Sequence, residues 1–112
     1  MSRHEDKPRL RDMLEHARVA CDAAKVRSRG DLDADPVFRA ACERFIEIIG
    51  EAAAGVLPGF KDRHPEIPWR EIIGTRNVLV HAYARIDLDV LWTILDQDLP
   101  ELIAKLEDLL RS

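Results

Sequence analysis

The chain has 112 residues, of which 46% are hydrophobic and 34% are charged. This length fits one domain whose core needs neither disulfides nor a structural metal. The formal net charge of −4 and the pI near 5.5 argue against a protein that coats nucleic acid indiscriminately. No apolar run approaches the roughly 20 residues of a membrane span, and no signal-peptide core is present, so we expect a cytoplasmic protein without a membrane partner.

The N-terminal third of the chain predicts an arm followed by a helix. Residues 1–8 are polar and charged, which predicts a flexible arm, and one helical domain is expected over residues 9–112. Apolar residues then recur at alternating spacings of four and three, which predicts a helix from about Arg9 to Val26. They are Leu10, Leu14, Ala17, Cys21 and Ala24. Residues 27–33 are expected to form a connecting loop.

A second helix is predicted to start at Asp35-Pro36, because aspartate caps free backbone amides and proline suits the first helical position. It should stop before Pro58-Gly59. Its expected buried stripe is Phe38, Cys42, Phe45, Ile49, Ala52 and Val56. Glu43, Glu47 and Glu51 follow one another at i, i+4, which we interpret as a solvated stripe in preference to a metal site. Cys21 and Cys42 are expected to be buried thiols.

The remaining elements complete an all-α prediction. A short turn of helix over 60–64 and an extended turn around Pro65 and Pro68 lead to a third helix, anchored by Trp69 and two isoleucines. A last helical region begins at Asp87 and carries leucines in a seven-residue rhythm, with a kink or break at Pro100. The economical fold is an antiparallel bundle of four to five helices.

The segment from Thr75 to Tyr83 places an arginine, a histidine and a tyrosine within eight residues. At 100° per residue, Arg76 and His81 lie roughly 140° apart around a helix, whereas Asn77 and His81 share a face. Either the arginine side chain curls around the helix, or a two-fold dimer assembles the site from two chains. Alone, such a trio is unspecific, and a structural histidine is its ordinary interpretation.

The residue types nevertheless suit RNA cleavage. RNA carries its own nucleophile, the 2′-hydroxyl, so a catalyst needs a group that exchanges protons near neutral pH and a fixed positive charge for the phosphate. His81 and Arg76 fit these roles, and the fork of the arginine suits two phosphate oxygens. This chemistry requires no metal and no cofactor.

Arg76 to Tyr83 matches the R-x4-H-x-Y signature of HepT-like toxins in the HEPN superfamily, and the chain resembles this family over roughly residues 9–110. The order of its other motifs is also similar. They are Arg9-Leu10-Arg11-Asp12-Met13-Leu14, Ile48-Ile49-Gly50-Glu51-Ala52, His64-Pro65-Glu66-Ile67-Pro68-Trp69, Ile72-Ile73-Gly74 and Asp98-Leu99-Pro100.

The resemblance implies an HEPN-like homodimer whose signature segments line an interfacial cleft. It further implies a metal-independent ribonuclease toxin of a type VII-like toxin-antitoxin pair, whose partner is an MNT-type nucleotidyltransferase antitoxin that adds AMP to a tyrosine. Arg76 and His81 take the catalytic positions, Tyr83 the modified position, and Asn77 a supporting one. Val78 departs from some relatives, which have a basic residue there.

Two alternatives stay open from the sequence. The chain could be a non-enzymatic helical partner or regulatory subunit of a nucleotidyltransferase, or a purely structural helical domain. Arg70 and Arg85 flank the signature and are the best candidates for auxiliary RNA contacts, although solvated surface is the commoner role for such residues. Trp69 and Trp92 are expected to be packing anchors, and His64 a turn residue.

Overall fold

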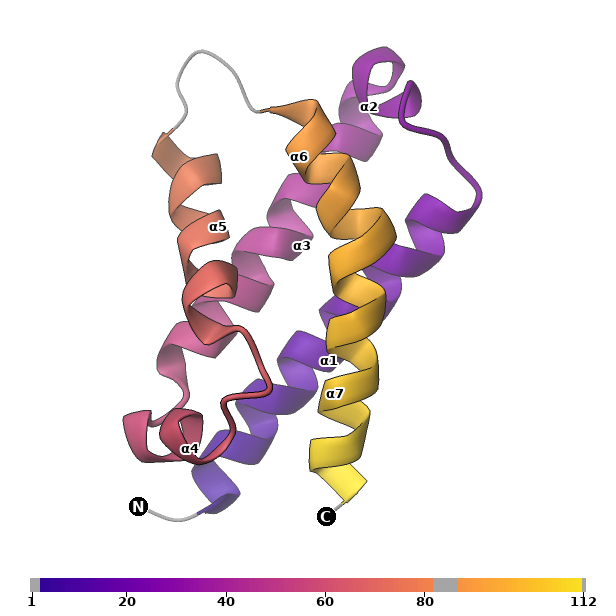
Figure 1. Cartoon of the computed structure of the whole chain (residues 1–112). Helices are drawn as coiled ribbons and strands as arrows, with labels where there is room; N and C mark the ends of the chain where they lie inside the picture. Colours follow the sequence, from indigo (N-terminus) through magenta and orange to yellow (C-terminus); the bar gives the residue numbers. More distant parts are fainter. Residues whose placement is uncertain (1–2, 82–86, 112) are drawn as a thin grey trace.

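A computed structural model describes residues 3–81 and 87–111, and for residues 3–5 and 76–81 it describes the backbone alone. Within these ranges the chain is helical without a strand, which confirms the predicted all-α fold. The long elements run antiparallel to their neighbours in sequence (Figure 1). They are α1 (Arg3–Lys25), α3 (Pro36–Gly55), α5 (Trp69–His81) and a continuous rod made of α6 (Leu88–Thr93), the π-helix η1 (Ile94–Asp98) and α7 (Leu99–Arg111).

Two short helices close opposite ends of the bundle (Figure 1). α2 (Asp31–Ala34) lies in the segment that the sequence predicted as a loop, and its Leu32 is fully buried. α4 (Pro58–Arg63) corresponds to the short turn of helix predicted over 60–64. Among the described residues, no helix is long and apolar enough to cross a membrane.

The N-terminal residues differ from the prediction. α1 begins at Arg3 rather than near Arg9, so residues 3–8 are helical where a flexible arm was expected. The side chain of Asp6 is only 2% exposed, and its Oδ1 accepts a hydrogen bond of 3.1 Å from the backbone N–H of Leu57. Leu57 immediately precedes α4 and lacks a side-chain cap of its own. Although the N-terminal segment is polar, its Asp6 therefore links the start of α1 to the start of α4 through a hydrogen bond.

The buried residues of the first helix are those that the sequence predicted, whereas the buried face of α3 differs in part from the prediction. All five apolar residues predicted to be buried in the first helix are buried in α1. In α3, however, Ile46 and Ala53 are buried, whereas Phe45 and Ala52 of the predicted stripe are only partly buried. The physical reason is that α3 packs between α1 and α5, so its buried sector is set by two neighbours instead of one.

The predicted helix starts at two aspartates are confirmed. Asp35 accepts hydrogen bonds from the backbone N–H groups of Val37 and Phe38, and α3 ends at Gly55, before Pro58. Asp87 accepts in the same way from the N–H groups of the second and third residues after it. Both carboxylates satisfy donors that a helix start would otherwise leave free.

Pro100 widens the last helix without splitting it. Proline lacks an N–H group, and its ring crowds the carbonyl four residues earlier. The preceding turn is the π-helix η1, in which the N–H of Leu99 donates to the carbonyl of Ile94, five residues before it. The rod continues as α7 to Arg111. The predicted kink is thus accommodated as one wide turn.

The two cysteines are buried and free, as predicted. The thiol of Cys42 is fully buried, and this burial, with a smaller contribution from Glu43, raises its pKa to about 11. Burial likewise raises the pKa of the Cys21 thiol. Neither thiol has the low pKa of a reactive cysteine, so both belong to the core.

Candidate active site on helix α5

The start of α5 is firmly anchored. Trp69 is 8% exposed, and its Nε1 donates a hydrogen bond of 2.9 Å to the carbonyl of His64. The ring of Phe60 meets the Trp69 ring edge to face, with centroids 6.4 Å apart. This arrangement confirms the predicted packing role of Trp69 and fixes where α5 begins.

The first half of α5 packs on α3. Ile72 and Ile73 are partly buried against the core, and the two helices lie side by side (Figure 1). The hydroxyl of Thr75 donates to the carbonyl of Glu71 at 2.7 Å. Gly74 permits a bend, but α5 continues as an α-helix from Trp69 to His81. The residues before the signature segment are therefore held on a rigid element.

The backbone of three candidate site residues lies on the last turns of α5. They are Arg76, Asn77 and His81. Because residues 76–81 are α-helical, positions 76 and 81 lie roughly 140° apart around the helix axis. Tyr83 and Arg85 lie outside the described residues. The structure thus brings Arg76 and His81 onto one helix, on different sides of it, and both arrangements considered from the sequence stay open.

Two basic residues that precede the signature segment in the sequence contact groups near α4. The Nζ of Lys61 lies 3.5 Å from the carbonyl of Ala54, and the guanidinium of Arg63 lies 6.0 Å from the ring centroid of Phe60. Arg70, on the first turn of α5, is exposed. It is therefore accessible to an anionic ligand.

His64 is a turn residue, as predicted. It ends α4, and its Nδ1 lies 3.2 Å from a carboxylate oxygen of Glu66. The carboxyl pKa of Glu66 is lowered by its own backbone N–H and by this histidine. His64 precedes α5 whereas His81 ends it, and the rise of the helix between them is roughly 18 Å. The two histidines of one chain are too far apart to share a reacting group.

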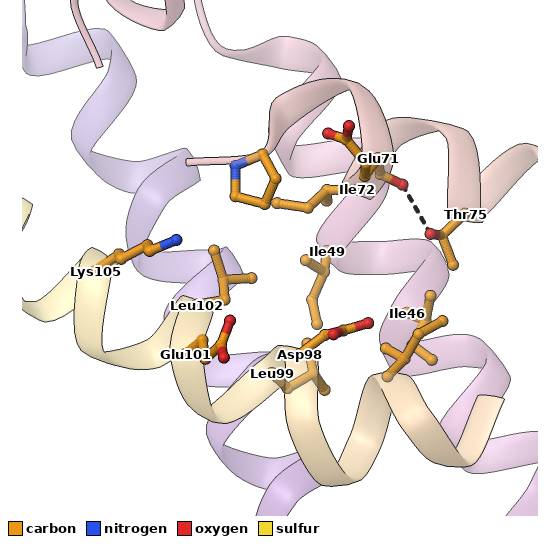
Figure 2. A pocket seen from close by; sticks show the side chains of 12 residues that line it. Ile46, Ile49, Glu71, Ile72, Thr75, Asp98, Leu99, Glu101, Leu102 and Lys105 are labelled. Atoms are coloured by element: carbon orange, nitrogen blue, oxygen red, sulfur yellow. Dashed lines mark hydrogen bonds between the residues drawn. The ribbon is translucent and has the colours of Figure 1, made fainter. Parts of the chain in front are cut away.

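A groove that sequence reasoning missed runs between α5 and the rod, with α3 as its floor (Figure 2). Its volume is about 220 Å³. Its apolar lining comprises Ile46, Ile49, Pro68, Ile72, Ile94, Leu99 and Leu102. Its polar lining comprises Glu71, Thr75, Asp98, Glu101 and Lys105. Three segments distant in sequence build it, so no local pattern could have revealed it.

The rim of this groove is acidic. Glu71 stands on the α5 side, and Asp98 and Glu101 stand on the side of the rod, whereas Lys105 is the cation in its described lining (Figure 2). Burial and the neighbouring Glu101 raise the carboxyl pKa of Asp98. These carboxylates would repel a polyanion such as RNA, so the groove is a poor candidate for an RNA-binding surface.

The fold and the site together define an all-α protein whose candidate catalytic arginine and histidine lie on one helix of an antiparallel bundle. The family model described as "Ribonuclease HepT-like" matches residues 13–109. The chain belongs to this HepT-like family.

Individual relatives agree with the family match. The chain is 35% identical to "Putative RNase MJ1380" of Methanocaldococcus jannaschii, over 96% of this chain and 98% of the relative. It is 44% identical to "Probable ribonuclease HepT" of Thermococcus cleftensis, over 70% of this chain and 72% of the relative. It is 33% identical to "Putative RNase TTE0752" of Caldanaerobacter subterraneus, over 91% and 95%. No solved structure matches the chain.

Proposed function

We propose that this chain is a metal-independent endoribonuclease and the toxin of a type VII-like toxin-antitoxin pair. The observation that carries the proposal is the Arg76–His81–Tyr83 signature in the sequence of a chain that belongs to the HepT-like ribonuclease family, with positions 76 and 81 on the last turns of α5. The names of its relatives support the same activity, since they describe ribonucleases.

The proposed reaction uses the 2′-hydroxyl of RNA as nucleophile. A base removes its proton while the 2′-oxygen forms a bond to phosphorus, the bond from phosphorus to the 5′-oxygen breaks, and an acid protonates that oxygen. The products are a 2′,3′-cyclic phosphate and a 5′-hydroxyl. His81 exchanges the proton, and Arg76 stabilises the charge on the phosphate oxygens. Asn77 supports the site, and Arg70 and Arg85 contact the RNA backbone.

The proposal includes a homodimer. Positions 76 and 81 lie roughly 140° apart on α5, so one straight helix does not direct both residues at one phosphate. A two-fold axis near the end of α5 would place the arginine of one copy beside the histidine of the other. Each dimer would then hold two equivalent composite sites.

Regulation is proposed to act on Tyr83 by transfer of AMP from an MNT-type nucleotidyltransferase antitoxin. Tyr83 follows the arginine by seven positions and the histidine by two in the sequence. AMP on this tyrosine would add a negative phosphodiester and a bulky base to a site meant for an anionic backbone, so charge repulsion and occlusion would both oppose RNA binding.

The test of the activity is cleavage of total RNA by the purified chain in the presence of excess EDTA. Arg76→Ala and His81→Ala are each expected to lower the cleavage rate at least about a hundredfold. Arg44→Ala and His16→Ala are matched controls, because both are on other helices, and they should cleave like wild type. If the wild-type chain, shown to be folded, leaves RNA intact, the non-enzymatic partner becomes the better interpretation.

A mixing experiment decides whether the site is composite. Co-expressed Arg76→Ala and His81→Ala chains form mixed dimers in which one composite site contains both wild-type residues. Statistical mixing should then restore about a quarter of wild-type activity, whereas a site built within one chain stays inactive. For the modification, Tyr83→Phe should cleave RNA yet resist silencing by the nucleotidyltransferase and ATP. Full silencing of Tyr83→Phe would assign the switch to another residue or to complex formation alone.

A further inference from the structure

The groove between α5 and the rod combines an aliphatic floor with an acidic rim, and this combination is specific enough to define a ligand. Its aliphatic side chains come from α3, α5, η1 and α7, and Figure 2 shows them between the two helices that form its walls. The volume of about 220 Å³ has room for a few large side chains of an incoming segment, but not for a folded domain.

The rim determines the charge of that segment. The described lining holds three carboxylates against one ammonium group, and the carboxylates stand on both walls. None of the three forms an ion pair within the part of the chain that the structure describes. Partial desolvation and the neighbouring Glu101 raise the carboxyl pKa of Asp98. A cationic group at the rim would favour the charged form of this carboxylate.

We infer that the groove between α5 and the rod is a docking site for a basic amphipathic helix of another protein, whose apolar face fills the groove and whose lysines or arginines meet Glu71, Asp98 and Glu101. This is the helix-in-groove mode, in which apolar anchors provide affinity and flanking charges provide orientation. The inference does not depend on the proposed ribonuclease activity.

A second copy of the chain is a poorer occupant. A two-fold contact through this groove would be isologous and would place the same acidic rim on both sides of the interface. The lining has three carboxylates and one lysine in each copy, so two surfaces of the same net negative charge would be brought together. The acidic rim therefore favours a different, basic partner.

The wide turn at η1 contributes to this shape. Ile94 and Asp98 at its two ends both line the groove, and so does Leu99, which follows it. Pro100 follows this turn by two residues, and proline, which has no N–H group, accounts for the departure from a regular α-helix there.

The probe is a fluorescent amphipathic peptide of leucine and lysine at helical spacing, titrated with the intact chain and followed by anisotropy. The control peptide has the same leucines, with glutamate in place of each lysine. The lysine peptide should bind, the glutamate peptide should not, and added salt should weaken the binding. The double variant Asp98→Asn with Glu101→Gln should weaken binding about five- to tenfold.

The matched control removes two carboxylates elsewhere, Asp62→Asn with Asp96→Asn, because both are exposed and neither lines the groove. It should bind like wild type. Amide chemical shifts on peptide addition should change at Ile72, Leu102 and Lys105. Equal weakening by both double variants, or shift changes confined to other helices, would overturn the inference. The inference would also fail if the chain were a dimer that Asp98→Asn with Glu101→Gln strengthened, since the occupant would then be a second copy.

Discussion

The buried carboxylate of Asp6 should contribute measurably to stability, although the sequence around it is typical of a disordered arm. It accepts the N–H of Leu57 at 3.1 Å, and its side chain is 2% exposed. Asp6→Ala would leave this backbone donor without its partner in a partly buried setting, which costs about 1–3 kcal/mol. For a domain of 112 residues, that corresponds to a lowering of Tm by roughly 4–12 °C.

Thermal unfolding followed by circular dichroism measures this effect. Asp12→Ala is the matched control, because Asp12 lies on the same helix but is exposed. Asp6→Asn should lose less stability than Asp6→Ala, since the amide oxygen can still accept. A deletion of residues 1–8 should cost at least as much as Asp6→Ala. If Asp6→Ala and Asp12→Ala unfold at the same temperature, the tie between α1 and α4 contributes nothing and the arm predicted from composition is the better description.

Four further predictions concern the core, a helix cap and the groove. Trp69→Phe should cost about 1 kcal/mol or more in chemical denaturation, because it removes the Nε1 donor to the His64 carbonyl, whereas Trp92→Phe should cost less. Cys42, with its thiol pKa raised to about 11, should react with iodoacetamide at pH 8 only after unfolding; rapid labelling of the folded chain would contradict its burial. The carboxyl pKa of Asp35 is lowered by its hydrogen bonds to Arg27 and to backbone N–H groups, so its stabilisation is present above the unfolded-state pKa and is lost as the pH falls through the lower, folded-state pKa. Asp35→Ala should therefore destabilise at neutral pH and converge with wild type in strong acid. Asp98 has the opposite sign, because desolvation and the neighbouring Glu101 raise its carboxyl pKa; since its side chain is exposed, Asp98→Asn should raise Tm only slightly at pH 7 and leave it unchanged near pH 3.

Features set by neighbours in sequence were predictable. The caps at Asp35 and Asp87 follow from the chemistry of an aspartate one residue before a helix, and the structure has both. The α1 stripe follows from the 3.6-residue period, because α1 buries one face. The start of α5 after Pro68 and the membership of the HepT-like family were also predictable, since both depend on residue types at short spacings.

Features set by distant partners were not predictable in this way. Nothing around Asp6 signals that its carboxylate meets Leu57, 51 positions away. On α3, Ile46 is buried and Phe45 only partly so, because both α1 and α5 pack against this helix. The 3.6-residue period of the sequence does not by itself decide between these two neighbours. The groove joins residues of three segments that are distant in sequence, so no local pattern predicts its acidic rim.

The position of the groove beside α5 has a consequence for the proposed site. α5 packs mainly on α3, and the rod stands across the groove from it, so an occupant would contact α5 on one side and the rod on the other. Binding there would alter RNA cleavage only if the occupant bound two arrangements of α5 with different affinities. The anchor at Trp69 holds the start of the helix, so any such difference must arise toward its end, where Arg76 and His81 lie. A groove peptide that binds without changing the cleavage rate would therefore mean that docking at the groove and catalysis are independent.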